Sequence, residues 1–302
     1  RTLGYTEQPY VVIIGGGQGG IALGARLRML GVPTIIVEKN ERAGDSWRNR
    51  YKSLHLHDPV WYDHLPYLPF PPNWPVFPSK DKMGDWLEMY ANIMELNYWT
   101  RSRVTNAAWD DATKTWTVTV DRDGETVTLT PKQLVFATGM SGKPMRPVFK
   151  GMDRFKGDQH HSSDHPGPDA YAGKRAVVIG SNNSAHDIAA ALWEHDADVT
   201  MVQRSPTHVI RSETLVDLGF GNTYSEAALA RGIDTYRADM KSASMPYALA
   251  HEEYVPMQDE IRERDADLYD GLAKAGFMLD WGDDNSGIQM LYLRRGSGYY
   301  ID

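Results

Sequence analysis

An apolar strand that runs directly into a glycine cluster is the feature that most restricts how this chain can fold. Residues 11–14 read Val-Val-Ile-Ile, a β-branched run typical of a buried strand in a parallel sheet. Helical periodicity then extends from residue 21 to residue 30 and stops at Gly31. Between them the sequence follows the pattern G-x-G-x-x-G, with Gly15, Gly17 and Gly20. This order predicts an α/β fold that begins with a strand–turn–helix unit.

The spacing of these glycines has a physical reason. The first glycine allows a tight turn, the second lets the backbone approach a pyrophosphate, and the third lets the helix pack closely on the strand. The N-terminus of the helix offers N–H groups and the positive end of its dipole to the phosphates. We therefore predict dinucleotide contacts at this turn, including Gln18 within it. The alternative is a glycine-rich turn without a ligand.

A second apolar strand, residues 34–37, ends in Glu38, which lies 23 residues after Gly15 (38 minus 15). A carboxylate at this offset can hydrogen-bond the hydroxyl groups of an unphosphorylated ribose. The first site therefore suits FAD, with Glu38 and the adjacent Lys39 among the predicted contacts.

The same order of elements returns in the second half of the chain. Residues 175–179 form an apolar strand, residues 185–193 a helix with a small-residue face, and residues 198–202 the next strand. The turn begins at Gly180, but Asn182 and Ala185 stand where the other two glycines would be. Asn tolerates positive φ better than most residues, so the turn remains feasible.

The residue after the second strand distinguishes the two turns. Arg204 lies 24 residues after Gly180 (204 minus 180), at nearly the offset of Glu38 but with the opposite charge. An arginine there can pair with a 2′-phosphate, which a carboxylate would repel. The second site therefore suits NADPH. The alternative is that Arg204 is a solvated surface charge.

The other segments predict structure rather than chemistry. Residues 116–120 and 126–129 alternate and flank an Asp-Arg-Asp-Gly turn, which indicates a hairpin. Residues 59–78 are rich in proline and aromatic residues, so we expect an irregular wall that covers a cofactor or packs in a core. Residues 225–276 read mainly as helices broken by Pro246 and Pro256.

Composition excludes several classes of protein. The 302 residues are 41% hydrophobic, which is enough for two domains with a core each. The net charge of −8 argues against a nucleic-acid partner. There is no apolar run of the length that a bilayer requires and no signal-peptide pattern at the N-terminus, so we expect a soluble, cytoplasmic protein without a membrane partner. The absence of cysteine excludes a redox-active cysteine pair within the chain.

Four local motifs, in this order, resemble the class B flavin-containing monooxygenases, which include YUCCA-type enzymes and Baeyer-Villiger relatives. They are the first glycine turn, Gly44-Asp-Ser-Trp47, the Ala137-Thr138-Gly139 run that follows an apolar strand, and the stretch from Phe155 to His165. The last fits the family fingerprint F-x-G-x-x-x-H-x-x-x followed by an aromatic residue or His, through Phe155, Gly157, His161 and His165.

The resemblance implies roles for single residues. Trp47 and His57 would approach the flavin, Val104 would contact the adenine through its backbone, and Ala137, Thr138 and Gly139 would belong to the FAD site. Ser184, Arg204 and Ser205 would hold NADPH beside Gly180 and Asn182. His161 would lie in the linker between two domains. No catalytic side chain is assigned to the oxygen-transfer step.

The resemblance also implies a fold and a domain order. We expect two dinucleotide-binding Rossmann-like domains, an FAD-binding domain at residues 1–165 and an NADPH-binding domain at residues 166–302. The sequence starts with Arg1 and stops in a predicted strand after Gly296, so we expect that the natural polypeptide continues and that the C-terminal part of the FAD domain is missing. Asp45 and Asn182 depart from the family pattern, and the ending His165-Pro166 is intermediate between the family's Tyr or Phe ending and its Trp-Pro ending.

The implied function is a monooxygenase that uses NADPH and O₂. Reduced flavin would form a hydroperoxide that oxygenates a small organic substrate by N- or S-oxidation or by oxidative decarboxylation of a 2-oxo acid; the ester-forming oxidation of a ketone is also open. One alternative is an NADPH oxidase that releases hydrogen peroxide, and another is a non-catalytic nucleotide-binding fragment. A metal site at His160, His161 and His165 is disfavoured because no carboxylate pattern accompanies these residues. The sequence does not indicate an oligomeric state.

Overall fold

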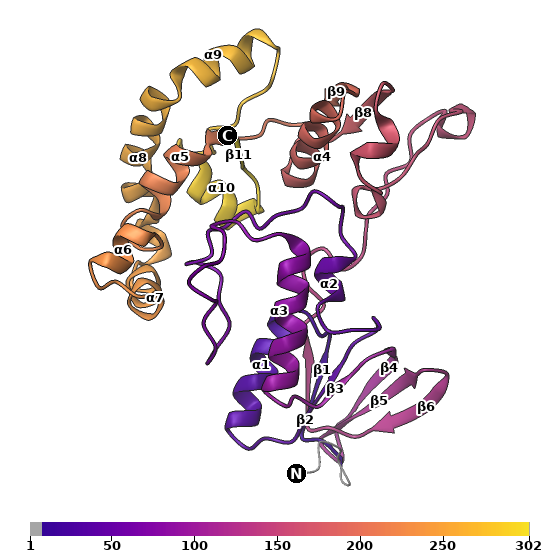
Figure 1. Ribbon diagram of the computed structural model, residues 1–302. Helices are drawn as coiled ribbons and strands as arrows, with labels where there is room; N and C mark the ends of the chain where they lie inside the picture. The colour runs from indigo at the N-terminus through magenta and orange to yellow at the C-terminus, as the bar shows by residue number, and fades with distance from the viewer. Residues whose placement is uncertain (1–7, 302) are drawn as a thin grey trace. The chain divides into compact units, whose positions relative to one another are not determined.

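The computed structural model describes residues 8–301 (Figure 1). The chain divides into two compact units. The first unit combines the residues up to Arg50 with His64–Asp164, and the second combines Tyr51–Asp63 with the residues from His165 onward. The boundary after Asp164 thus lies inside the Phe155-to-His165 stretch. The predicted functional domains, 1–165 and 166–302, stay a prediction; the compact units differ from them by grouping residues 51–63 with the second unit.

A four-stranded parallel sheet forms the centre of the first unit. Its strands follow the order β3 (Tyr98–Trp99), β2 (Thr34–Val37), β1 (Val11–Ile14) and β7 (Gln133–Phe136). Because β1 and β2 lie inside the sheet, both are apolar and almost entirely buried, as their β-branched sequences predict. Helices α1 (Gln18–Met29) and α3 (Lys80–Ile93) contact each other beside the sheet.

An antiparallel sheet packs against the parallel one. It consists of β4 (Ser102–Asp110), β5 (Thr115–Arg122) and β6 (Glu125–Leu129). The predicted hairpin is confirmed, with Asp123 and Gly124 both at positive φ in its turn. The two sheets share a core of Val12, Ile35, Val37, Val118, Val120 and Leu129.

The proline-rich segment has no regular helix or strand between residues 59 and 78, as predicted. In the first unit its Phe70 and Trp74 rings stack at 4.7 Å, and both pack edge-on against Trp86 of α3. These half-buried rings cover α3 with apolar area where the backbone has no secondary structure, so this part of the segment packs on α3.

The second unit repeats the strand–helix–strand order as predicted. Strand β8 (Arg175–Ile179), helix α4 (Asn183–Glu194) and strand β9 (Asp198–Val202) form a parallel pair with its crossover helix. A second parallel pair joins β10 (Val209–Arg211) to β11 (Tyr299–Ile301), so the last described strand lies beside β10.

Helices make up the remainder of the second unit. The segments are α5 (Ser212–Thr214), a π-helix (Leu215–Phe220), α6 (Glu226–Ala230), α7 (Thr235–Ala243), α8 (Ala250–Arg264), α9 (Ala266–Lys274) and α10 (Gly287–Arg295). Ile210, Ile261 and Ile288 belong to the core on which these elements pack. Short turns complete the chain: α2 (Asp45–Arg48) and the 3₁₀ turns Met152–Arg154, Ser162–Asp164, Pro168–Tyr171 and Tyr247–Leu249.

One predicted helix break is wrong. The chain does break near Pro246, but α8 continues through Pro256. A proline removes the hydrogen bond to the carbonyl four residues earlier, which here belongs to Glu252. Both residues are exposed, so water can hydrate that carbonyl and the buried face of α8 keeps the helix in place.

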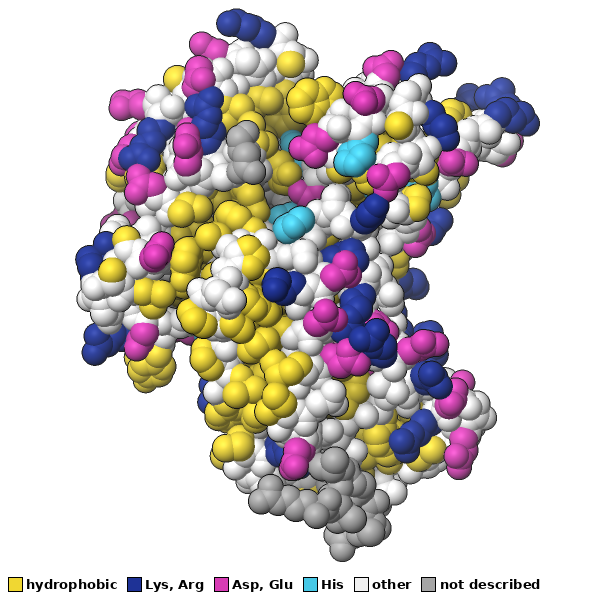
Figure 2. Space-filling view, in the orientation of Figure 1, with side chains coloured by type: hydrophobic (Ala, Val, Ile, Leu, Met, Phe, Trp, Pro, Cys, Tyr) yellow, Lys and Arg dark blue, Asp and Glu magenta, His cyan; other side chains and the backbone are white. Residues whose placement is uncertain are grey.

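Charged side chains of both signs share the surface. On the face that Figure 2 shows, Lys and Arg are interspersed with Asp and Glu, and no continuous basic patch covers the described residues on that face. No helix between residues 8 and 301 combines the length and the apolar character that crossing a bilayer requires.

Thr207, directly before His208, forms a β-bridge with Leu279, and this bridge anchors the start of β10.

His208 is a fully buried ionisable group in the second unit. Its side chain has no exposed area, and its Nδ1 donates a hydrogen bond to the Asp280 carbonyl at 2.8 Å. Its Nε2 is buried without a hydrogen-bond partner and its ring lies against Trp281. Burial lowers the pKa of His208 to about 4, because an imidazolium there would leave its second proton without an acceptor.

The second unit should therefore lose stability as the pH falls from about 6.5 to 4, where the unfolded chain binds a proton at this position and the folded chain does not. His208→Asn keeps a donor for the Asp280 carbonyl and removes the titration. We expect the variant to lose about 2–3 kcal/mol less than the wild type between pH 7.5 and pH 4. Urea unfolding at several pH values measures this difference; the exposed control His251→Asn should track the wild type. Parallel pH profiles for His208→Asn and the wild type would contradict the assignment.

Candidate functional site

The first glycine turn sits between the carboxyl ends of β1, β2 and β7. The Gly15 N–H donates to the Val37 carbonyl at 2.9 Å, and the Ala137 N–H donates to the Ile14 carbonyl at 2.8 Å. Gly15 has a φ of +105°, and a Cβ atom on it would lie 2.4 Å from the Ala137 oxygen. The turn therefore requires glycine at this position, and it meets the Ala137–Gly139 run as predicted.

The other two glycines of the motif differ in what surrounds them. A Cβ atom on Gly20 would lie 2.0 Å from the Gly15 carbonyl oxygen, so the close packing of α1 requires glycine there. A Cβ atom on Gly17 would meet only Ser46, at 3.5 Å, which is an ordinary contact. The protein alone would thus tolerate a side chain at Gly17. The missing side chain leaves room for a pyrophosphate to reach the backbone.

The N-terminus of α1 is suited to an anion. Its N-cap, Gly17, has no capping side chain, and its first turn contains no acidic residue. The Ser46 hydroxyl beside the turn is buried and has no hydrogen-bond partner among the described residues. Free N–H groups, the dipole of a 12-residue helix and an orphaned hydroxyl fit the phosphates of a dinucleotide.

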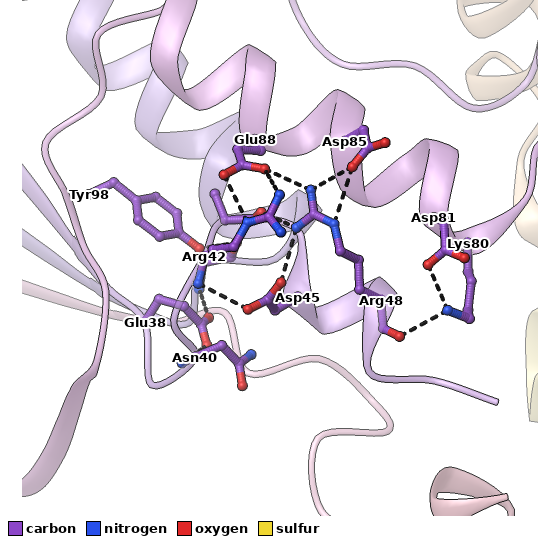
Figure 3. Close-up of polar contacts among 12 residues, drawn as sticks. Glu38, Asn40, Arg42, Asp45, Arg48, Lys80, Asp81, Asp85, Glu88 and Tyr98 are labelled. Carbon is purple, nitrogen blue, oxygen red and sulfur yellow. Dashed lines mark hydrogen bonds and ion pairs between the residues drawn. The ribbon is translucent and has the colours of Figure 1, made fainter. Parts of the chain in front are cut away.

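Glu38 lies beside this turn and is 6% exposed (Figure 3). Its carboxylate accepts hydrogen bonds from the backbone N–H of Gly16, at 2.7 Å, and of Asn40, at 2.9 Å. The Tyr98 hydroxyl donates to the Gly16 carbonyl at 2.7 Å. These bonds hold the carboxylate at the turn, and each carboxylate oxygen keeps a lone pair for a ribose hydroxyl.

An ion-pair network fixes the Gly44–Trp47 motif onto α3 (Figure 3). Arg48 has a side chain that is 14% exposed and pairs with Asp45 at 3.0 Å, Asp85 at 2.9 Å and Glu88 at 2.9 Å. The hydrogen bond from Arg42 holds the pKa of Glu88 below its ordinary value. Since Arg48 is largely buried, the loss of a partner would leave a poorly solvated charge, so the network holds α2 and Ser46 at the glycine turn.

Trp47, predicted to approach the flavin, is held from two sides. Its Nε1 donates to the Gln18 side chain at 3.1 Å, and the Arg50 guanidinium lies 4.9 Å from its ring. The indole thereby joins α2 to the first turn of α1.

Two other predicted FAD contacts differ in exposure. Lys39, directly after Glu38, is exposed. Val104 is half-buried against the two-sheet core, at a register shift of β4 that interrupts the ladder.

The second glycine turn has the same backbone design with fewer glycines. The Gly180 N–H donates to the Val202 carbonyl at 2.9 Å, and Gly180 has a φ of +129°. The expectation that Asn182 uses positive φ is wrong, because its φ is −101°, close to the −76° of Gly17. A Cβ atom on Gly180 would lie 3.7 Å from that of Ala185, so this turn is wider than the first and accepts alanine.

The N-terminus of α4 also suits an anion. Asn182 is its N-cap but makes no capping hydrogen bond, and the first turn has no acidic residue. The Asn183 side-chain oxygen is buried without a hydrogen-bond partner, and Ser184 is half-buried in the same turn. These features match those of the first turn.

Arg204 and Ser205 are both exposed after β9. Within residues 8–301, no hydrogen bond or ion pair engages the Arg204 guanidinium. The Ser181 hydroxyl bonds the Thr207 hydroxyl at 2.8 Å and the Ser205 carbonyl at 3.4 Å, which ties this stretch to the turn. An unpaired guanidinium on a stretch that is tied to this turn is suited to a phosphate.

His57 lies in the second compact unit, with Asp187 of α4. Its Nε2 donates to the Asp187 carboxylate at 2.9 Å, and the side chain of His57 is 22% exposed. Its predicted approach to a flavin stays a prediction.

The fingerprint stretch is split between the units. The first contains Phe155, which is 61% exposed, and Gly157, on whose face the Phe155 ring lies. It also contains His161, whose Nδ1 accepts a hydrogen bond from the Ser163 N–H at 3.2 Å. His165 belongs to the second, is buried and stacks on Tyr171 at 5.7 Å. In the described part of the chain, no group of three or more His, Asp or Glu side chains could hold a metal ion.

Sequence reasoning missed several residues that shape these sites. Ser46 lies within a motif that was found, so its hydroxyl could have been inferred from its place before Trp47. Tyr98 and Asp187 have no local signal, because each meets its partner through the fold: Tyr98 is 82 residues from Gly16.

Comparison with known proteins identifies the family. Residues 12–218 match the family model described as pyridine nucleotide-disulphide oxidoreductase. Indole-3-pyruvate monooxygenase YUCCA1 of Oryza sativa subsp. japonica is 37% identical over 69% of this chain and 51% of its own length. Probable indole-3-pyruvate monooxygenase YUCCA9 of Arabidopsis thaliana is 34% identical over 70% and 50%. The chain spans about half the length of these curated relatives.

Solved structures agree with this match. A flavin monooxygenase variant from Stenotrophomonas maltophilia has a TM-score of 0.63 and 26% identity, covering 76% of this chain and 69% of that one. The structure of OTEMO in complex with FAD and NADP has a TM-score of 0.58 and 28% identity, covering 68% and 41%. The chain belongs to the pyridine nucleotide-disulphide oxidoreductase family and, within it, to the class B flavin-dependent monooxygenases. The resemblance and the α/β fold inferred from the sequence are confirmed.

The two neighbouring glycines of α1 provide a matched test of the first site. Gly20→Ala places a methyl group against the Gly15 carbonyl, whereas Gly19→Ala meets nothing within 4 Å. We expect Gly20→Ala to lose most of its bound FAD and about 2–4 kcal/mol of stability, because the turn must shift. Flavin absorbance per protein and urea unfolding measure both effects. Equal FAD content in the two variants would contradict this account of the turn.

Proposed function

We propose that this chain binds FAD at its first glycine turn and NADPH at its second, as part of a monooxygenase that inserts oxygen from O₂ into a small organic substrate. The observation that carries the proposal is the pairing of two similar turns with opposite charges. Glu38 follows the first strand pair, and the exposed, unpaired Arg204 follows the second. A carboxylate favours an unphosphorylated ribose and an arginine favours a 2′-phosphate.

The chain's own residues bind and orient the two dinucleotides. Glu38 would accept hydrogen bonds from ribose hydroxyls, and Ser46 with the N-terminus of α1 would meet the pyrophosphate. Ser184 and the N-terminus of α4 would do the same for NADPH, with Arg204 and Ser205 at the 2′-phosphate. FAD bound there would supply the redox chemistry that connects NADPH to O₂. A side-chain dyad or triad for acid–base catalysis is therefore not required.

In this proposal two dinucleotide-binding Rossmann-like domains, residues 1–165 and 166–302, carry these cofactors. The linker fingerprint with His161 lies between them. Because the chain spans about half of its curated relatives, we propose that a further segment of the protein completes the FAD domain and the substrate pocket. We also keep the cytoplasmic location expected from the sequence.

The names of the relatives motivate the substrate classes to test. Two are indole-3-pyruvate monooxygenases, so a 2-oxo acid with an aromatic side chain is the first candidate. The name of a more distant structural neighbour, the S-allyl-L-cysteine S-oxygenase of Allium sativum, motivates sulfides as a second class to test. Amines are the third substrate class to test.

The coupling of NADPH oxidation to substrate oxygenation separates a monooxygenase from an oxidase. We expect bound flavin to bleach faster with NADPH than with NADH under anaerobic conditions. After O₂ is admitted, hydrogen peroxide per NADPH should fall when the correct 2-oxo acid, sulfide or amine is present, and oxygenated product should account for the difference. One peroxide per NADPH with every candidate would instead indicate an oxidase. Protein that does not retain or take up FAD would overturn the proposal.

Arg204 tests the cofactor preference. Arg204→Ala should raise the KM for NADPH by about tenfold or more and leave the KM for NADH within about twofold, because only NADPH has a 2′-phosphate. Steady-state flavin reduction with each nucleotide measures this ratio. Lys241→Ala, which removes one exposed positive charge from α7, is the matched control and should change neither KM. A parallel rise in both constants would exclude Arg204 from the 2′-phosphate site.

A further inference from the structure

The Asp187 carboxylate joins three distant segments of the second unit. Its Oδ2 accepts hydrogen bonds from the Tyr51 hydroxyl at 2.7 Å and from His57 Nε2 at 2.9 Å, and its Oδ1 accepts one from the Tyr299 hydroxyl at 2.8 Å. The donors lie 136, 130 and 112 residues away in the sequence. A carboxylate with donors on both oxygens is fixed in position and in rotation.

This carboxylate is buried and ionised. Its side chain is 12% exposed. Burial acts to raise the pKa of Asp187, but the hydrogen bonds from His57 and from the two tyrosine hydroxyls outweigh it and hold the pKa below its ordinary value. A buried anion that loses one donor is destabilised far more than an exposed one, so the three segments depend on each other.

Asp187 lies three residues after Ser184, one helical turn into α4. The returning C-terminal segment also contacts that first turn. The Tyr299 ring stacks on His186 at 4.4 Å, and the Asn182 side chain donates to the Gly296 carbonyl at 3.4 Å. The N-terminus of α4 is therefore held in place by contacts with other segments, not by a capping hydrogen bond.

The same contact sets the tautomer of His57. A carboxylate acceptor at Nε2 requires a proton on that nitrogen, so in the neutral ring Nδ1 is left as a hydrogen-bond acceptor for another group. No hydrogen bond within residues 8–301 engages Nδ1. The edges of the Tyr299 and Tyr300 rings, at 6.1 and 5.8 Å between centroids, restrict the rotation of the imidazole.

We propose that Asp187 is a positioning residue that holds the phosphate-binding end of α4 and fixes His57 in the Nε2–H tautomer. It acts through α4 and through the imidazole and touches neither nucleotide. The part that concerns α4 rests on the proposed binding of a nicotinamide dinucleotide at the second glycine turn. The part that concerns His57 is independent of it.

Binding of the oxidised nucleotides tests the first part without turnover. NADP⁺ and NAD⁺ share the pyrophosphate, so Asp187→Asn should weaken the binding of both by about the same factor, roughly tenfold. Arg204→Ala should weaken NADP⁺ alone. Isothermal titration of the purified chain with each nucleotide gives the four ratios. A wild type that binds neither nucleotide would overturn the proposed function, whereas Asp187→Asn with unchanged affinities would overturn only the part of this inference that concerns α4.

A pair of adjacent tyrosines provides a milder test if Asp187→Asn does not fold. Tyr299→Phe removes one donor to Asp187 and keeps the ring that stacks on His186. Tyr300→Phe removes a hydroxyl that donates to the Leu56 carbonyl at 3.2 Å. We expect about a threefold loss of both affinities for Tyr299→Phe and none for Tyr300→Phe. Equal losses in the two variants would assign a general packing role to this region and contradict the proposal.

Nitrogen-15 NMR of the histidine side chains tests the second part. In the wild type the His57 ring should show the shifts of an Nε2–H tautomer, assigned by comparison with His57→Gln. In Asp187→Asn, or in Tyr299→Phe to a smaller extent, that signal should move toward a tautomer mixture. An Nδ1–H ring in the wild type would overturn the assignment, whatever the nucleotide affinities.

Discussion

The close approach of two backbone segments at the first glycine turn is the constraint on which the first unit depends. Gly15 and Gly20 must both lack side chains, because the Ala137 and Gly15 carbonyls occupy the positions where Cβ atoms would lie. This packing brings the carboxyl ends of three parallel strands and the N-terminus of α1 together. The dipole and the free N–H groups of α1 then point to the same side as the Glu38 carboxylate. This position, beyond the carboxyl ends of the strands, is where ligands usually bind in such sheets.

The second unit builds a similar turn by other means. Its turn is wider and tolerates Asn182 and Ala185, so fewer glycines define it. The position of α4 depends instead on side-chain contacts from segments that are distant in sequence, above all those of Asp187. A buried carboxylate of this kind favours one arrangement of the segments that donate to it, because it is stable only with all its donors in place.

The two turns differ in the charge of the residue that follows their second strand. Where the sequence places Glu38, the structure surrounds the carboxylate with backbone donors and buries it. Where the sequence places Arg204, the structure leaves the guanidinium exposed and unpaired in the described part of the chain. The first arrangement holds the turn and keeps acceptor positions for ribose hydroxyls, and the second is suited to a ligand that carries negative charge.

The sequence by itself determined the strands around the two turns, the turns themselves, the hairpin and the family, because each depends on residues that are neighbours in the chain. It misjudged Pro256, where exposed backbone can be hydrated, and Asn182, where the turn does not need positive φ. Only the tertiary structure decided that Tyr98 braces the first turn and that Asp187 joins His57 to α4. These contacts span 82 to 136 residues, and no periodicity or local motif encodes which distant donor a buried polar group will meet.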